Sequence, residues 1–154
     1  MKRKILISFF AMIFLIGIWG AFTRKGPIEK NIGYTYLSDG EKTVSLDGYK
    51  VSSYTNGKNK KYDYPDIQSK KNNLNKVNVS KDNSNNMTLS YSKEHYGDVT
   101  YSLYDSEFNV ILDNENALTV PGDADSLYYV SVLVSWGSEK QNVSMVYYFS
   151  IQTE

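Results

Sequence analysis

The sequence predicts an all-β fold, an antiparallel sandwich, preceded by one N-terminal hydrophobic helix. Apolar and polar residues alternate with a period of two along most of the chain after residue 76, which is typical of strands with one buried face. Turn residues separate these segments at intervals of about ten residues, as in antiparallel sandwiches. No segment after the N-terminal run has a helical period.

A hydrophobic segment covers residues 5–22, and basic residues flank it on both sides: Lys2, Arg3, Lys4, Arg24 and Lys25. As a helix it would be about 27 Å long, enough to cross a hydrocarbon core. Ile18-Trp19-Gly20 is a poor cleavage site, which favours an uncleaved anchor over a cleaved signal peptide. The basic N-terminus predicts a single-pass membrane protein with its C-terminal domain outside, secretion being the alternative.

The chain is expected to have three parts: a signal-anchor or signal peptide at 1–25, a polar linker at 26–41 and one sandwich domain at 42–154. Its 154 residues include no cysteine. This excludes disulfides, thiolate metal ligands and cysteine nucleophiles. The core alone must therefore stabilise an exported domain.

The first half of the domain contains few strands. Residues 43–46 and 49–55 are predicted to pair as a hairpin through Asp47-Gly48, a strong turn dipeptide, and Asn56-Gly57 marks a further turn. Residues 58–76 hold many lysines and few aliphatic residues. They are predicted to form a solvated loop.

The second half is rich in strands, predicted at 77–80, 87–91, 99–104, 110–112, 118–120, 128–136 and 145–151. The turns between them include 113–116, 121–123 and the hairpin turn at 136–141. Adjacent residues of a strand point to opposite faces. We therefore expect Tyr148 and either Tyr128 or Tyr129 to be partly exposed.

Three motifs near the C-terminus carry a resemblance. They are an apolar pair with a Pro-Gly turn at 118–122, a strand ending in Trp at 128–136, and alternating aromatic residues at 147–151. Together they resemble the last strands of bacterial immunoglobulin-like domains of small exported or membrane-anchored proteins. The resemblance implies an immunoglobulin-like sandwich with a tyrosine corner at Tyr128 or Tyr129 and a binding role, but no enzymatic activity.

The charge is unevenly distributed along the chain, although the net charge is zero. Residues 26–97 contain 11 Lys and 8 acidic residues, whereas residues 98–154 contain 9 acidic residues and a single Lys. Zero net charge argues against a global polyanion-binding function, and no nucleic-acid partner is expected. If the two halves separate in space, the surface is bipolar.

The sequence contains no convincing catalytic constellation. His95 is the only histidine, and it lies in a polar turn at 92–97, so we interpret it as an exposed loop residue. No nucleophile elbow is present. The paired carboxylates lie in turns, where Asp is favoured for backbone hydrogen bonding. We expect no enzyme and no cofactor.

Acidic turns supply the oxygen ligands that calcium would need, from Asp113, Glu115, Asp123 and Asp125. Neither turn has the Gly and Glu spacing of an EF-hand loop. Turn formation explains these residues without an ion, and no metal site is predicted.

The leading hypothesis is a non-enzymatic extracytoplasmic module that binds a protein partner at the cell surface through exposed tyrosines, combined with the acidic turns. The candidate residues are Tyr104, Tyr128, Tyr129 and Tyr148, because outward tyrosines offer large contact area at low entropic cost. The alternative is a module for wall glycan or an anionic polymer, using a basic patch together with exposed tyrosines. That patch comprises Lys58, Lys60, Lys61, Lys70, Lys71 and Lys76.

Overall fold

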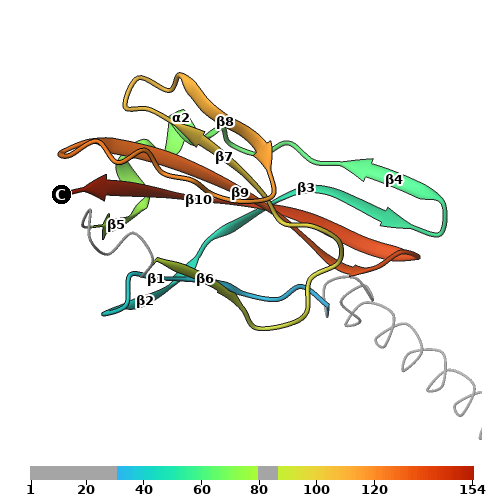
Figure 1. Ribbon diagram of the computed structural model, residues 1–154. Helices are drawn as coiled ribbons and strands as arrows, with labels where there is room; N and C mark the ends of the chain where they lie inside the picture. Colours follow the sequence, from blue (N-terminus) through green and yellow to red (C-terminus); the bar gives the residue numbers. More distant parts are fainter. Residues whose placement is uncertain (1–30, 80–86) are drawn as a thin grey trace, which may run out of the picture. The chain divides into compact units, whose positions relative to one another are not determined.

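The computed structural model describes residues 31–79 and 87–154 (Figure 1). The hydrophobic segment at 5–22 lies outside these residues, as does most of the N-terminal unit Met1–Asn31. The unit Ile32–Glu154 is the folded domain. Within the described ranges, no helix is long and apolar enough to cross a membrane.

The domain is mostly antiparallel β-structure arranged in two packed sheets. Its elements are β1 (Thr35–Ser38), β2 (Thr43–Leu46), β3 (Gly48–Thr55), β4 (Lys58–Lys61), α2 (Ile67–Lys70), the 3₁₀ turn η1 (Lys71–Asn73), β5 (Asn75–Val79), β6 (Thr88–Tyr91), β7 (Thr100–Tyr104), β8 (Val110–Glu115), β9 (Leu127–Ser138) and β10 (Gln141–Thr153).

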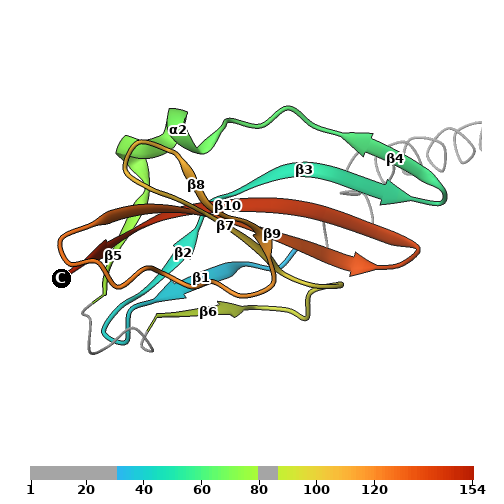
Figure 2. The ribbon, with the colours of Figure 1, turned by 45° about the horizontal axis from the view of Figure 1, so that its top comes forward.

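A large and a small sheet form the two layers. The small sheet has the order β2-β1-β6, and the large sheet has the order β4-β3-β10-β9-β7-β8, with β5 added in parallel to the end of β10. Figure 2 shows the large sheet between the small sheet on one side and α2 on the other. Both faces of its central strands are therefore covered.

The main core lies between the two sheets. The burial alternation predicted for the two long strands is confirmed for β9, whereas every residue of β10 from 145 to 151 is buried, so both of its faces are covered. The Trp136 indole donates from Nε1 to the Tyr147 hydroxyl at 3.1 Å within this core. Leu37 and Leu46 of the small sheet are buried opposite them.

A second cluster covers the outer face of β9 and β10. Ile67 of α2 packs with Tyr129, Val146 and Tyr148. Phe108 stacks on Tyr129 with ring centroids 4.4 Å apart. The segment from β4 to β5 and the loop between β7 and β8 thus form a cover that an open sandwich would lack.

The hairpin predicted at Asp47-Gly48 is wrong. β2 pairs with β1 in the small sheet, whereas β3 pairs with β4 and β10 in the large one. The chain crosses between the layers at Asp47, and Gly48 does not adopt a positive φ. A Cβ at Gly48 would lie 2.5 Å from the Tyr147 ring, so this glycine serves close packing rather than a turn.

The other predicted turn, Asn56-Gly57, is confirmed. Both residues have positive φ, 49° and 81°, as a two-residue hairpin of type I′ requires. This turn joins β3 to β4, so the loop predicted at 58–76 instead contains an edge strand, a short helix and the start of β5.

Other boundaries also differ from the sequence prediction. The hairpin turn predicted at 136–141 is shorter, since β9 continues to Ser138 and β10 begins at Gln141. β1 lies inside the stretch 26–41 that was predicted to be a linker, so the domain begins before residue 42. β8 continues to Glu115, through most of the turn predicted at 113–116. Residues 118–120 are not in a strand, although they alternate like one, because no described strand pairs with them.

Candidate functional site

The tyrosines predicted to be exposed are buried. Tyr128, Tyr129 and Tyr148 are exposed by only 4%, 7% and 7%, and Tyr104 is half-buried. Adjacent tyrosines do face opposite sides of the large sheet, as expected, but both sides of that sheet are covered. The predicted binding surface made of these four side chains is therefore wrong.

The basic residues lie on four different elements. Lys58, Lys60 and Lys61 project from the edge strand β4, every residue of which is exposed. The others belong to α2, η1 and β5: Lys70, Lys71 and Lys76. Lysines on an edge strand also prevent unwanted pairing with other strands, which explains β4 without a ligand.

Aromatic rings lie beneath several of these ammonium groups. The Nζ atoms of Lys60 and Lys50 lie 4.9 Å and 5.8 Å from the centroid of the Tyr62 ring. Lys70 Nζ lies 5.5 Å from the centroid of the Tyr49 ring. These cation–π contacts hold positive charges over the β3–β4 hairpin.

The calcium candidates make local hydrogen bonds. Asp113 accepts from Ser102 and Asn114, and Asp123 accepts from the Tyr128 hydroxyl at 3.3 Å. Across the described part of the chain, no three His, Cys, Asp or Glu side chains gather in a metal-binding geometry.

His95 is half-buried rather than exposed. Its Nδ1 lies 2.8 Å from the Gly97 carbonyl oxygen, which requires a proton on Nδ1. Its ring packs edge-on against Tyr91, with centroids 5.2 Å apart. These contacts describe a residue that orders the loop after β6.

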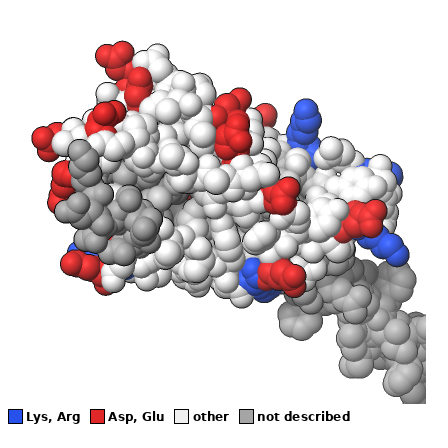
Figure 3. Space-filling model, viewed as in Figure 1, with Lys and Arg blue, Asp and Glu red and all other residues white. Residues whose placement is uncertain are grey.

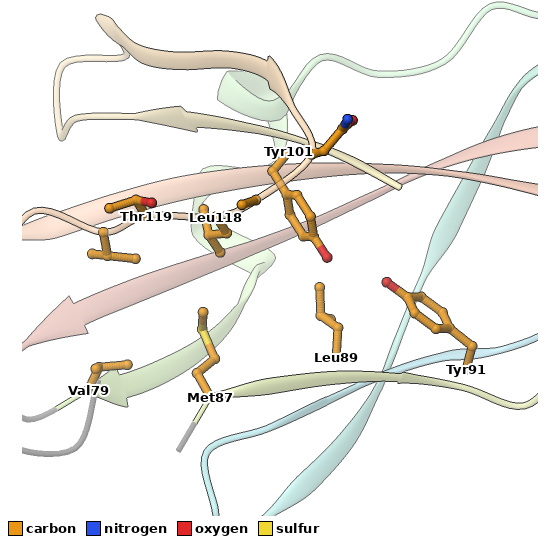
Figure 4. Close-up of a pocket in the computed structure, with 10 residues that line it drawn as sticks. Val79, Met87, Leu89, Tyr91, Tyr101, Leu118 and Thr119 are labelled. Carbon is orange, nitrogen blue, oxygen red and sulfur yellow. The ribbon is translucent and has the colours of Figure 1, made fainter. Parts of the chain in front are cut away.

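A hollow lies beside β6, and we call it the β6 groove. It is about 470 Å³ in volume, within the range that proteins use for ligands. Leu89 and Tyr91 of β6 point into it toward Tyr101 of β7 and Leu118, as Figure 4 shows. The segment 116–120 forms its opposite wall.

The Tyr91 hydroxyl is the notable polar group of this groove. It is buried, and among the described residues no group lies within hydrogen-bonding distance, although it points toward the Tyr101 hydroxyl in Figure 4. Burial raises the pKa of Tyr91 well above its usual value, and a weak interaction with the Tyr101 hydroxyl raises it further. Tyr101 is therefore the nearest polar neighbour of this hydroxyl, and a group that enters between the two rings could bond to both.

β6 has one unpaired edge within the described residues. It pairs with β1 alone, with Leu37 opposite Leu89. The N–H of Ser92, next after Tyr91, donates to the Tyr34 carbonyl on the β1 side. Hydrogen-bonded and non-hydrogen-bonded pairs alternate along an antiparallel ladder, so Ser92 and Ser90 bond to β1 and the residues that alternate with them do not. The backbone N–H and C=O groups of Leu89 and Tyr91 therefore face away from β1, on the side of the groove.

Acidic residues flank the far wall of the β6 groove. Glu115 precedes the segment 116–120 and Asp123 comes after it, and no residue lining the groove is basic. In Figure 3 acidic side chains dominate the end of the molecule that carries the β7–β8 hairpin. The basic side chains lie mainly toward the β3–β4 end, so the charge asymmetry of the sequence is also one of space.

Sequence reasoning missed this groove, although one signal was present. Residues 118–120 have the alternation of a strand, and here they form an extended wall that pairs with no described strand. A strand-like segment without a partner thus marks the place where the sandwich is open.

Comparison with known proteins gives no match. Neither a family model, nor a curated protein, nor a solved structure matches this chain. A function for this domain therefore has to be inferred from its geometry.

Proposed function

We propose that this chain is a non-enzymatic extracytoplasmic interaction module that binds a protein partner at the cell surface. The observation that carries this proposal is the β6 groove, an open hollow lined by both apolar and polar side chains. Concave sites with apolar walls and a few polar groups are the usual places where proteins bind their ligands. The groove takes the place of the tyrosines, which are buried.

The extracytoplasmic placement is supported by the sequence. The basic flank and the apolar run at 5–22 direct the C-terminal domain across a membrane. An immunoglobulin-like class for the sandwich belongs to the same proposal. It is supported by buried Trp136 and by the Tyr128 hydroxyl, which bonds five residues upstream as in a tyrosine corner, although its acceptor is the Asp123 carboxylate and not the backbone.

Site-directed photo-crosslinking in the expressing cell tests the proposal. A photoreactive amino acid replaces Thr119, which is exposed on the wall of the β6 groove, in the full-length chain. The control carries it at Ser138, which is exposed at the tip of the β9–β10 hairpin. One protein crosslinked from Thr119 but not from Ser138, on a full-length species in the membrane fraction, is the expected result. A shortened species in the medium that crosslinks to nothing from either position would contradict the proposal.

A second candidate function is binding of an anionic wall polymer by the β3–β4 hairpin. The favouring observation is that Lys50 and Lys60 are held over the Tyr62 ring, next to a fully exposed strand containing Lys58 and Lys61. Poly(glycerol phosphate) is a suitable probe. Binding through lysines should weaken about tenfold or more between 50 and 200 mM salt.

Matched charge reversals locate such binding. Lys58→Glu with Lys61→Glu should abolish it, whereas Lys42→Glu with Lys71→Glu changes the net charge equally on other elements. Equal loss in both double variants would show that only the overall charge matters, and this would remove the hairpin as a site.

A further inference from the structure

The edge of β6 that no described strand pairs with, together with the hollow beside it, defines one kind of occupant. Leu89 and Tyr91 direct their side chains into the groove and their backbone N–H and C=O groups away from β1. An added strand would run beside β6 at about 4.8 Å. Its alternate side chains would then enter the groove while its backbone completes the ladder.

The groove fits apolar side chains with a polar group among them. Leu89 and Leu118 provide apolar walls, and the buried Tyr91 hydroxyl has no partner. Such a hydroxyl costs free energy while it is unpaired, so an occupant that bonds to it gains affinity. A Thr or Ser side chain pointing inward would be suited to this position.

Charge adds a second property of the occupant. Glu115 and Asp123 flank the wall segment 116–120, and the lining residues include no positive charge. The sequence from residue 98 onward contains 9 acidic residues and only Lys140 as a basic one. A bound segment with Lys or Arg on either side of its apolar residues would complement this rim and be steered toward it.

We propose that the β6 groove binds an extended segment of a partner protein by strand addition to β6, the segment having alternating apolar residues flanked by basic ones. This inference rests on the proposed function and names the chemistry of the partner. Main-chain hydrogen bonds supply affinity in this mode, and the inward pockets supply specificity.

A designed peptide is the probe: Lys-Lys-Val-Thr-Thr-Thr-Val-Lys-Lys, whose third, fifth and seventh residues place Val, Thr and Val on one face. It is labelled with a fluorophore and titrated into the full-length chain in detergent solution. We expect saturable binding by fluorescence anisotropy. A peptide with glutamates in place of the lysines should bind at least tenfold more weakly. A peptide N-methylated on alternate residues of its β6-facing edge should lose binding to the same extent, because it lacks the ladder donors.

A matched pair of variants tests whether the peptide binds in the β6 groove. Ala117→Trp puts a large ring on the groove wall, whereas Ala124→Trp makes the same change at an exposed alanine outside the lining. The first should reduce binding at least tenfold and the second should leave it unchanged. Equal affinity in both variants would overturn the proposal.

Amide hydrogen exchange followed by NMR measures directly whether the peptide forms backbone hydrogen bonds with β6. In the free protein, the amides of Leu89 and Tyr91 should exchange faster than that of Ser90, whose partner is β1. The peptide should slow both. Saturable binding without this protection would show that the groove holds a ligand by other means and would overturn strand addition.

The outcome also separates this inference from the proposed function. A partner crosslinked from Thr119, together with no binding of either peptide and no protection at β6, would overturn strand addition alone. An absence of any crosslinked partner from Thr119 would remove the proposed function itself.

Discussion

The buried tyrosines differ in what their hydroxyl groups contact. Tyr147 accepts a hydrogen bond from Trp136, and Tyr148 donates to the Pro65 carbonyl oxygen at 3.0 Å, which fastens the outer cover to the sheet. Tyr91 has no partner. Removing a hydroxyl group should therefore have a different effect at each position.

The bond between Trp136 and Tyr147 gives the first prediction. Tyr147→Phe leaves the indole N–H unpaired in a fully buried site, so the free energy of unfolding should fall by about 1–3 kcal/mol. Urea unfolding followed by Trp fluorescence measures this. Tyr96→Phe, at a ring that is 39% exposed, should change it by less than about 0.5 kcal/mol, and equal losses in the two variants would refute the role of the bond.

The same burial predicts a loss of stability at alkaline pH. Burial raises the pKa values of Tyr91, Tyr147 and Tyr148 in the folded state above the unfolded value of about 10. Above that pH the unfolded chain releases protons that the folded chain retains. The contribution of these groups is therefore complete below about pH 10 and is lost as the pH rises further.

Urea midpoints between pH 8 and pH 11.5 test this. The wild-type midpoint should decline above pH 10, and Tyr148→Phe should flatten the decline because it removes one of the three groups. Tyr34→Phe, at a ring that is 66% exposed, serves as the control. A decline of the same slope in Tyr148→Phe would mean that other groups cause it.

At the scale of elements, glycine has two structural roles that the sequence alone does not distinguish. Gly57 supplies the positive φ of a hairpin, as the Asn-Gly dipeptide indicates. Gly48 follows Asp47 as Gly57 follows Asn56, yet it begins β3, just after the chain crosses from the small sheet to the large one. A glycine is needed there because the Tyr147 ring occupies the space of a side chain. Such a contact joins residues far apart in sequence, and no local pattern reveals it.

Gly48→Ala tests this crossover. The new methyl group would lie 2.5 Å from the Tyr147 ring, so the ring or the strand must shift, at a cost of about 1–3 kcal/mol. Gly122→Ala is the matched control, since a Cβ there has open space and φ is not positive. Thermal melts should show a lower midpoint only for Gly48→Ala, and an unchanged midpoint would contradict the packing argument.

The extent of the strands could be predicted where burial enforces alternation and not elsewhere. β9 and β10 were located from sequence, because one face of each is buried in the main core, although both are longer than predicted. β4 was missed because its four residues are all polar, and β1 because it lies in a stretch that was interpreted as a linker. The tyrosines were wrongly predicted to be exposed because the segment 62–74, which covers them, has the composition of a polar loop. Ile67 is its main apolar contact with them.

At the scale of the whole molecule, the face shown in Figure 3 carries more acidic side chains at the β7–β8 end and more basic ones toward the β3–β4 hairpin. The β6 groove lies beside the acidic segment 113–125, whereas Lys50 and Lys60 lie over the Tyr62 ring beside the β3–β4 hairpin. Under the two proposals, a basic peptide and an anionic polymer would therefore bind at different surfaces of the domain.

The division of the chain gives the last prediction. Residues 32–154 form a compact unit with its own core, so a chain lacking residues 1–31 should keep its β-structure and unfold within about 2 °C of the full-length midpoint. In the expressing cell, the full-length chain should sediment with membranes, whereas the shortened one should not, because it lacks the apolar run at 5–22. Circular dichroism melts and fractionation measure the two results separately. A shortened chain that is folded but still bound to membranes would show that the domain itself holds the protein there, and the anchor would have to be abandoned.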